Sequence, residues 1–221
     1  MNLIEKIIDQ IYPTVCGMCG RLYKESICNR CMKKLQKELI CKVHYKYYSG
    51  EFVKRIYLFR YKDELRNIFL SYKFNERNYL YDFFVQIILK NKDMNCFLRK
   101  YDVIIPVPLY YKNLNKRGYN QCGLISKGIA KVLENIEYRG DVLIKSKNIL
   151  KQSSLTEEER KRNVRDAYMI KNFEKNWFEL QNKNILIFDD ICTTGNTINE
   201  CTRVLKELEP KSIGVFTIFK N

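Results

Sequence analysis

The sequence lacks any long uncharged segment. The uncharged stretch Val103 to Tyr111 has nine residues and contains two prolines, and no uncharged stretch exceeds the eleven residues from Gln10 to Gly20, whereas a membrane-spanning helix needs roughly 20 mostly apolar residues. The N-terminal segment carries Glu5 and Asp9 within its apolar pattern, so it lacks the uninterrupted apolar core of a secretory signal peptide. We therefore expect a cytoplasmic protein without membrane insertion.

Acidic residues and histidine are also scarce. Asp and Glu number 25 against 40 Lys and Arg, which gives a net charge of +15, and His44 is the only histidine. A positive field attracts polyanions at low salt, so phosphorylated substrates and nucleic acids are permitted partners. Much of the surplus is lysine in a chain also rich in asparagine, as an AT-rich genome encodes, so the charge alone carries little weight.

The apolar content suffices for one substantial core and a small additional module, since 46% of the 221 residues are hydrophobic. Strand patterns occur at 52–59, 102–106, 142–144, 168–170, 185–188 and 213–219, and helical patterns at 64–89 (with a break near Asn75), at 121–133 and from 196 onward. This alternation predicts an α/β domain with a mainly parallel sheet flanked by helices. We expect this domain to span 51–221, after an N-terminal helix and a cysteine-rich module in 1–50.

Two cysteine pairs stand close together near the N-terminus. Cys16-x2-Cys19 and Cys28-x2-Cys31 are separated by eight residues, a spacing typical of a structural zinc site with four thiolates. Unligated thiols and an iron–sulfur cluster are the alternatives. Because all four ligands would come from the protein, the zinc would serve folding or docking and not catalysis.

The remaining cysteines show no second complete site. Cys41 and His44 form one C-x2-H pair without a matching pair, so His44 is expected to be a surface or packing residue. The other four are expected to be buried thiols: Cys96, Cys122, Cys192 and Cys201.

The most informative segment is 185–197, ILIFDDICTTGNT. An apolar strand ends in Asp189 and Asp190, at the carboxyl end where open α/β sheets bind ligands. A turn then leads into a helix whose first N–H groups are suited to a phosphate. The candidate phosphate-binding residues are Thr193, Thr194, Gly195, Asn196 and Thr197. The motif is neither a Walker loop nor G-x-G-x-x-G, and the alternative is an ordinary strand end and helix start.

Two further polar segments follow strands. The run ending in Val107 and Pro108 continues into Lys112 and Arg117, and a strand that opens into a basic loop suits a pyrophosphate; the alternative for Arg117 is a surface charge. The second segment, 146–165, contains Gln152 and Arg160. It is equally consistent with a mobile lid and with a surface helix capped by Thr156.

Together these segments resemble the ComF family, which combines an N-terminal zinc ribbon with a type I phosphoribosyltransferase domain. The PVPL and RGYNQ sequences at 106–109 and 117–121 and the acidic strand end are the most specific features. The resemblance implies binding of 5-phosphoribosyl-1-pyrophosphate (PRPP) with Mg²⁺. It assigns the ribose hydroxyls to the catalytic acids Asp189 and Asp190, the 5-phosphate to Thr193–Thr197, the pyrophosphate to Val107–Arg117, and a lid to Gln152 and Arg160. Many relatives have a double zinc ribbon, so the Cys41 and His44 pair looks like a degenerate second ribbon.

The resemblance leaves two functions open. In the first, the protein transfers phosphoribosyl from PRPP to an unknown acceptor in a process associated with DNA uptake. In the second, it is a non-catalytic, PRPP-responsive protein that binds single-stranded DNA beside a competence helicase, for which basic and aromatic residues would be suited.

Overall fold

The computed structural model describes residues 13–74, 77–146 and 166–221. The elements are α2 (Asn29–Glu38), β1 (Lys42–Tyr48), β2 (Glu51–Arg60), α3 (Asp63–Phe74), α4 (Leu80–Lys90), α5 (Lys92–Leu98), β3 (Val103–Pro106), α6 (Tyr111–Arg117), α7 (Gln121–Val132), β4 (Glu137–Tyr138), β5 (Leu143–Lys145), β6 (Tyr168–Ile170), α9 (Phe173–Leu180), β7 (Asn184–Cys192), α10 (Asn196–Lys206) and β8 (Ser212–Lys220). The strands and helices predicted after residue 51 are therefore confirmed. Within these ranges, no helix has the length and apolar character needed to cross a membrane.

A six-stranded sheet forms the centre of the molecule, in the order β1-β2-β8-β7-β3-β4. All neighbouring strands are parallel except the β1–β2 hairpin, which is antiparallel. The short strands β5 and β6 form a separate antiparallel pair. The predicted class, a mainly parallel sheet flanked by helices, is confirmed. Strand β1 lies before the expected boundary at residue 50, yet it pairs with β2 in this sheet.

Successive side chains along the strands point to opposite faces of the sheet, so one apolar core forms on each face. Ile104, Leu186 and Phe216 join the apolar faces of α3, α4, α5 and α7. Their sequence neighbours, among them Ile105 and Ile187, pack on the opposite face with residues of α9 and α10. Such two-sided burial explains why these strands are continuous apolar runs.

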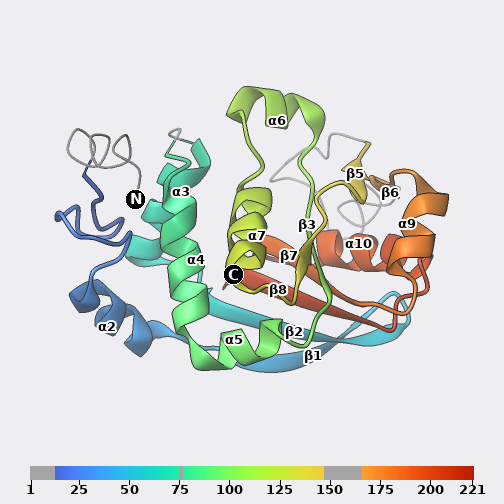
Figure 1. Ribbon diagram of the computed structural model, residues 1–221, viewed down its shortest axis with the longest axis horizontal. Coiled ribbons are helices and arrows are strands. Elements are labelled where there is room, and N and C mark those ends of the chain that lie inside the picture. Colours follow the sequence, from blue (N-terminus) through green and yellow to red (C-terminus); the bar gives the residue numbers. More distant parts are fainter. Residues whose placement is uncertain (1–12, 75–76, 147–165) are drawn as a thin grey trace.

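The cysteine-rich module packs directly on the helical layer. A Cβ added to Gly17 would lie 2.8 Å from Cδ2 of Leu80 and 3.0 Å from Cδ2 of Phe83, both on α4. Ion pairs link Lys34 to Glu64 at 2.6 Å and Lys90 to Glu25. Figure 1 shows α2 beside α4 at one end of the molecule, with α9 at the opposite end.

Candidate functional site

The two motif acids lie at the carboxyl end of β7, between β8 and β3. Asp189 is opposite Thr217 of β8, and on the other side the Val107 N–H donates to the Phe188 carbonyl at 2.9 Å. Asp190 is buried and Asp189 is half-buried. The strand order therefore places both carboxylates where a parallel sheet collects ligands.

Asp190 is held by residues from two other elements. Its Oδ2 accepts from Nε2 of Gln121 at 2.8 Å and from Nζ of Lys73 at 2.7 Å. Arg117 in turn donates through Nη1 to Oε1 of Gln121. The structure thus brings Arg117, expected to contact pyrophosphate, next to an acid expected to contact ribose. Lys73, on α3, has no counterpart in the sequence-based site.

The two acids have opposite pKa shifts. Burial, and then the charge of Asp190, raises the pKa of Asp189 to about 7. Burial also opposes ionisation of Asp190, but the charge and hydrogen bond of Lys73 and the hydrogen bond of Gln121 outweigh it and lower the pKa of Asp190. Near neutral pH the site therefore holds one carboxylate and one acid close to its titration midpoint.

The predicted phosphate loop connects β7 to α10. Gly195 has a φ of +87° and caps the N-terminus of α10, a left-handed conformation that glycine adopts without a Cβ clash. Thr193 and Thr194 are exposed. With Asp189 and the first residues of α10, this loop lines a hollow of about 30 Å³. The positive end of an eleven-residue helix faces this hollow.

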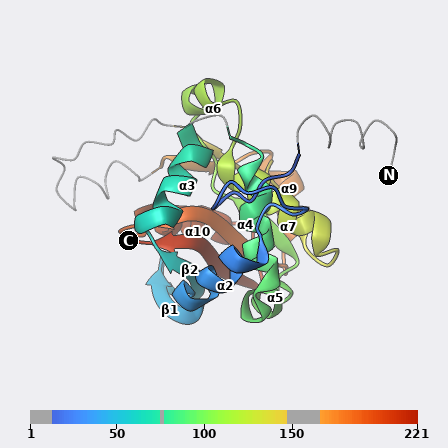
Figure 2. The same ribbon diagram turned by 90° about the vertical axis from the view of Figure 1, so that its left-hand side faces the viewer.

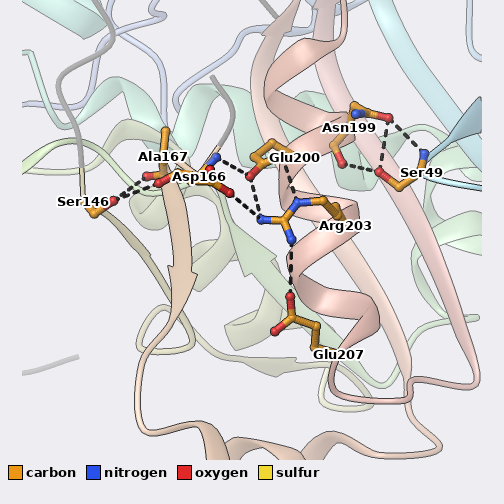
Figure 3. A network of polar contacts seen from close by, with 8 residues as sticks. All are labelled: Ser49, Ser146, Asp166, Ala167, Asn199, Glu200, Arg203 and Glu207. Carbon is orange, nitrogen blue, oxygen red and sulfur yellow. Dashed lines mark hydrogen bonds and ion pairs between the residues drawn. The ribbon is translucent and has the colours of Figure 1, made fainter. Parts of the chain in front are cut away.

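The β1–β2 hairpin packs against the phosphate loop and the start of α10. A Cβ on Gly195 would lie 3.0 Å from Oη of Tyr48, and Nζ of Lys46 donates to the Thr194 carbonyl at 3.4 Å. In the next turn of the helix, the N–H of Ser49 donates to Oδ1 of Asn199 at 2.9 Å (Figure 3). The loop and the start of α10 are therefore fixed by a segment about 150 positions earlier in the chain.

A second polar group fixes the middle of α10 (Figure 3). The buried carboxylate of Glu200 accepts the N–H of Asp166 at 2.8 Å and Nη2 of Arg203 at 2.8 Å. Arg203 also reaches Glu207 at 3.4 Å. These contacts connect the residues just before β6 to the helix that follows the phosphate loop.

The other predicted ligand-binding residues are more scattered. Val107 is buried and its carbonyl accepts from Nδ2 of Asn120 at 3.1 Å, while Pro108 is half-buried. The expected basic loop is instead largely the helix α6, which ends where Gly118 adopts a φ of +79°. Lys112 is exposed on α6, which lies at the outer edge of the molecule in both views (Figures 1 and 2). Gln152 and Arg160 lie outside the described residues.

The four N-terminal cysteines converge on one point. Their sulfur atoms all lie within 4.8 Å of one another, and Cys28 and Cys31 stand at the first turn of α2. Burial raises the pKa of Cys16, but backbone N–H groups, first that of Cys28, outweigh it and lower the pKa to about 7. Four converging thiols are a donor set that can hold a tetrahedral metal ion.

The remaining cysteines and His44 follow the predictions with one exception. Cys122, Cys192 and Cys201 are buried as expected, but Cys96 is exposed. This prediction was wrong because Cys96 lies on the outer face of the short helix α5, whose buried side chains are those of Met94, Phe97 and Leu98. The Cys41 thiol donates to Oδ1 of Asn91 at 3.3 Å, and His44 stacks on Tyr57 with ring centroids 5.3 Å apart.

Comparisons with known proteins agree with this architecture. Residues 125–221 match the family described as phosphoribosyl transferase domain. Competence protein F of Haemophilus influenzae is 25% identical over 206 residues, which cover 91% of this chain and 82% of that protein. Competence protein ComFC of Streptococcus pneumoniae is 28% identical over 217 residues, which cover 93% and 87%. A solved adenine phosphoribosyltransferase has a TM-score of 0.44 and 15% identity over 85% of this chain and 89% of its own, a distant likeness that carries no weight here.

The mainly parallel sheet and the matched region indicate the class that the chain resembles: residues 125–221 are similar to phosphoribosyl transferase domains. Within that class, the predicted resemblance to the ComF family is confirmed, because the two competence proteins align with almost the whole chain.

Proposed function

We propose that this protein binds PRPP at the carboxyl end of β7 and transfers its phosphoribosyl group to an acceptor in a process of DNA uptake. The observation that carries the proposal is a single continuous segment. Two acids lie near the carboxyl end of a central parallel strand, and a loop with left-handed Gly195 follows at the N-terminus of α10. Acceptors for a diol thus lie beside donors for a phosphate, and PRPP contains both groups. The link to DNA uptake rests on the names of the relatives.

Residues Thr193–Thr197 would hold the 5-phosphate. The exposed hydroxyls of Thr193 and Thr194 and the N–H groups at the start of α10 are available donors. The helix dipole favours a dianion at this end. The half-buried Asn196 and Thr197 would form the inner wall of the hollow.

Asp189 and Asp190 would accept hydrogen bonds from the ribose hydroxyls. Asp190 is suited to this because Lys73 and Gln121 favour its ionised form. Arg117, linked to Asp190 through Gln121, would place a positive charge toward the pyrophosphate. Mg²⁺ bound with PRPP would neutralise the pyrophosphate leaving group.

The transfer breaks the bond between ribose C1 and the pyrophosphate oxygen, which leaves with the electron pair, while the acceptor supplies the pair for the new bond. Such a reaction through a cationic ribose requires positioned donors and water exclusion more than it requires a protein nucleophile. The described residues would contribute by holding ribose and 5-phosphate on one rigid strand–loop–helix unit.

Phosphorus NMR of PRPP, Mg²⁺ and protein, with nucleobases, amines and single-stranded DNA as possible acceptors, tests the proposal. Pyrophosphate release with a new phosphoribosyl signal is expected. Broadened PRPP lines without turnover would contradict catalysis but support binding, and unchanged lines would contradict both. Asp190→Asn should abolish turnover, whereas Asp63→Asn, at an exposed acid on α3, should not.

We also propose that Cys16, Cys19, Cys28 and Cys31 bind one structural zinc ion, because their sulfur atoms converge within 4.8 Å. Elemental analysis of the purified protein should give one zinc per chain. Cys19→Ser should remove most of it, whereas Cys96→Ser, at an exposed thiol outside the cluster, should not. Iron in place of zinc, or no metal, would contradict the proposal.

A further inference from the structure

Lys73 is the only side chain of the helical layer α3–α4 with a described ion pair to the two motif acids. Its Nζ lies 2.7 Å from Oδ2 of Asp190, and the two side chains are only 15% and 8% exposed. A surface ion pair would contribute little, but a pair with this burial fixes both partners, since breaking it leaves a buried charge.

The fold places Lys73 there through its neighbours. Tyr72 is buried, and its hydroxyl donates to the Gln121 carbonyl at 2.8 Å, so α3 contacts the residue that also binds Asp190. Nζ of Lys73 lies 5.6 Å from the ring centroid of Phe69, one helical turn earlier. The helix, Gln121 and Asp190 therefore form one connected unit, and the lysine position follows from packing.

The positive charge of Lys73 reduces the electrostatic repulsion between the two acids and an anionic ligand. A polyanionic ligand such as PRPP would be repelled by two adjacent carboxylates in a partly desolvated position. Lys73 cancels the charge of Asp190, while burial raises the pKa of Asp189 to about 7. Near pH 7 the two acids and Lys73 together therefore add less than one full negative charge toward the ligand.

We propose that Lys73 is a positioning residue of the phosphoribose site: it binds one carboxylate oxygen of Asp190, keeps this acid aimed at the ribose diol and cancels the charge that would repel the phosphates. This inference rests on the proposed PRPP binding. It joins α3, which lies before the matched phosphoribosyltransferase region, to the binding site of that region.

A double-mutant cycle without ligand tests the pair itself. Lys73→Met should lower the melting temperature by about 5–10 °C, because it leaves a buried carboxylate unpaired. Lys73→Met combined with Asp190→Asn should recover much of this loss, and Lys62→Met, at an exposed lysine beside the same helix, should have little effect. Equal losses in the single and double variants would overturn the proposal.

Calorimetric titration with PRPP and with ribose 5-phosphate tests the positioning role. Lys73→Met should weaken both ligands about tenfold or more, Lys73→Arg should restore most of the affinity, and Lys73→Met should add little loss in the Asp190→Asn background. Multiplied losses in the double variant would indicate a merely structural lysine and overturn the proposal. Absence of PRPP binding by the wild-type protein, with an intact stability cycle, would instead refute the proposed function and with it the positioning role.

Discussion

Asp189 should cost the protein stability at neutral pH. Its pKa is raised to about 7 by burial and by the charge of Asp190, while an unfolded aspartate titrates near 3.9. Between about pH 4 and 7 the folded chain therefore retains a proton that the unfolded chain has released, so stability falls as pH rises through this window and the penalty is complete above it.

Asp189→Asn should consequently raise the melting temperature by about 4–8 °C at pH 8 and by much less at pH 4.5. Differential scanning calorimetry at both values measures this difference, with Asp63→Asn as an exposed control. An equal gain at both pH values would show that the raised pKa is not the cause. If Asp189→Asn both raises stability and abolishes PRPP binding, it shows the trade-off between stability and function that is expected at a functional site.

Gly195 is a second position where a single added atom, a Cβ, should change both stability and ligand binding. Its φ is +87°, and a Cβ would lie 3.0 Å from Oη of Tyr48. Gly195→Ala should therefore distort the phosphate loop, weaken PRPP about tenfold and lower the melting temperature by a few degrees. Gly50→Ala, at a φ of +90° with only Nζ of Lys206 within 4 Å, should affect stability alone. Unchanged PRPP affinity in Gly195→Ala would contradict the assignment of this loop.

Side chains that lie in a local motif could be predicted, and those that meet across the fold could not. The order of strand, acids, loop and helix indicates Asp189, Asp190 and Thr193–Thr197 from consecutive positions. Lys73 contacts Asp190 across 117 positions, and no local pattern distinguishes it from the other lysines of the chain. Only the packing of α3 on α7 and β7 shows that this lysine is buried.

The long helices and strands with a buried face were predicted, whereas the short helices α5 and α9, strand β1 and the helix α6 were missed. Strands β7 and β8 are nearly continuous apolar runs, so their periodicity is clear. Strand β1 is exposed at every position except Tyr48, and α6 has no buried residue. Strand β1 is stabilised by pairing with β2, and α6 by the turn at Gly118 that ends it. Neither contact produces a hydrophobic period in the sequence.

The close packing of the cysteine module on α4 can be tested by a substitution at Gly17. Leu80 and Phe83 fill the space beside Gly17 so closely that a side chain has no room. Gly17→Val should therefore loosen this contact, lower the melting temperature by about 4–8 °C and speed proteolysis near residue 24. Leu80→Ala in the same chain should recover part of the loss by opening space. A melting temperature unchanged by Gly17→Val would contradict this packing.

The expected division into residues 1–50 and 51–221 has an energetic consequence that can be measured. Buried residues of the cysteine module, among them Ile27 and Leu35, belong to the same apolar cluster as α4 and the sheet residues Leu186 and Phe216. A continuous core couples the two parts, so loss of order in one exposes surface of the other.

Removal of the proposed zinc should therefore lower the stability of the entire chain and not release a separate module. With excess chelator, calorimetry should show one transition at a melting temperature lower by about 10 °C or more, because metal binding to the folded state contributes directly to folding. The cysteine module would then unfold together with residues 51–221, and PRPP should protect both. Two separated transitions, with PRPP shifting only the second, would show instead that residues 1–50 fold independently of the domain.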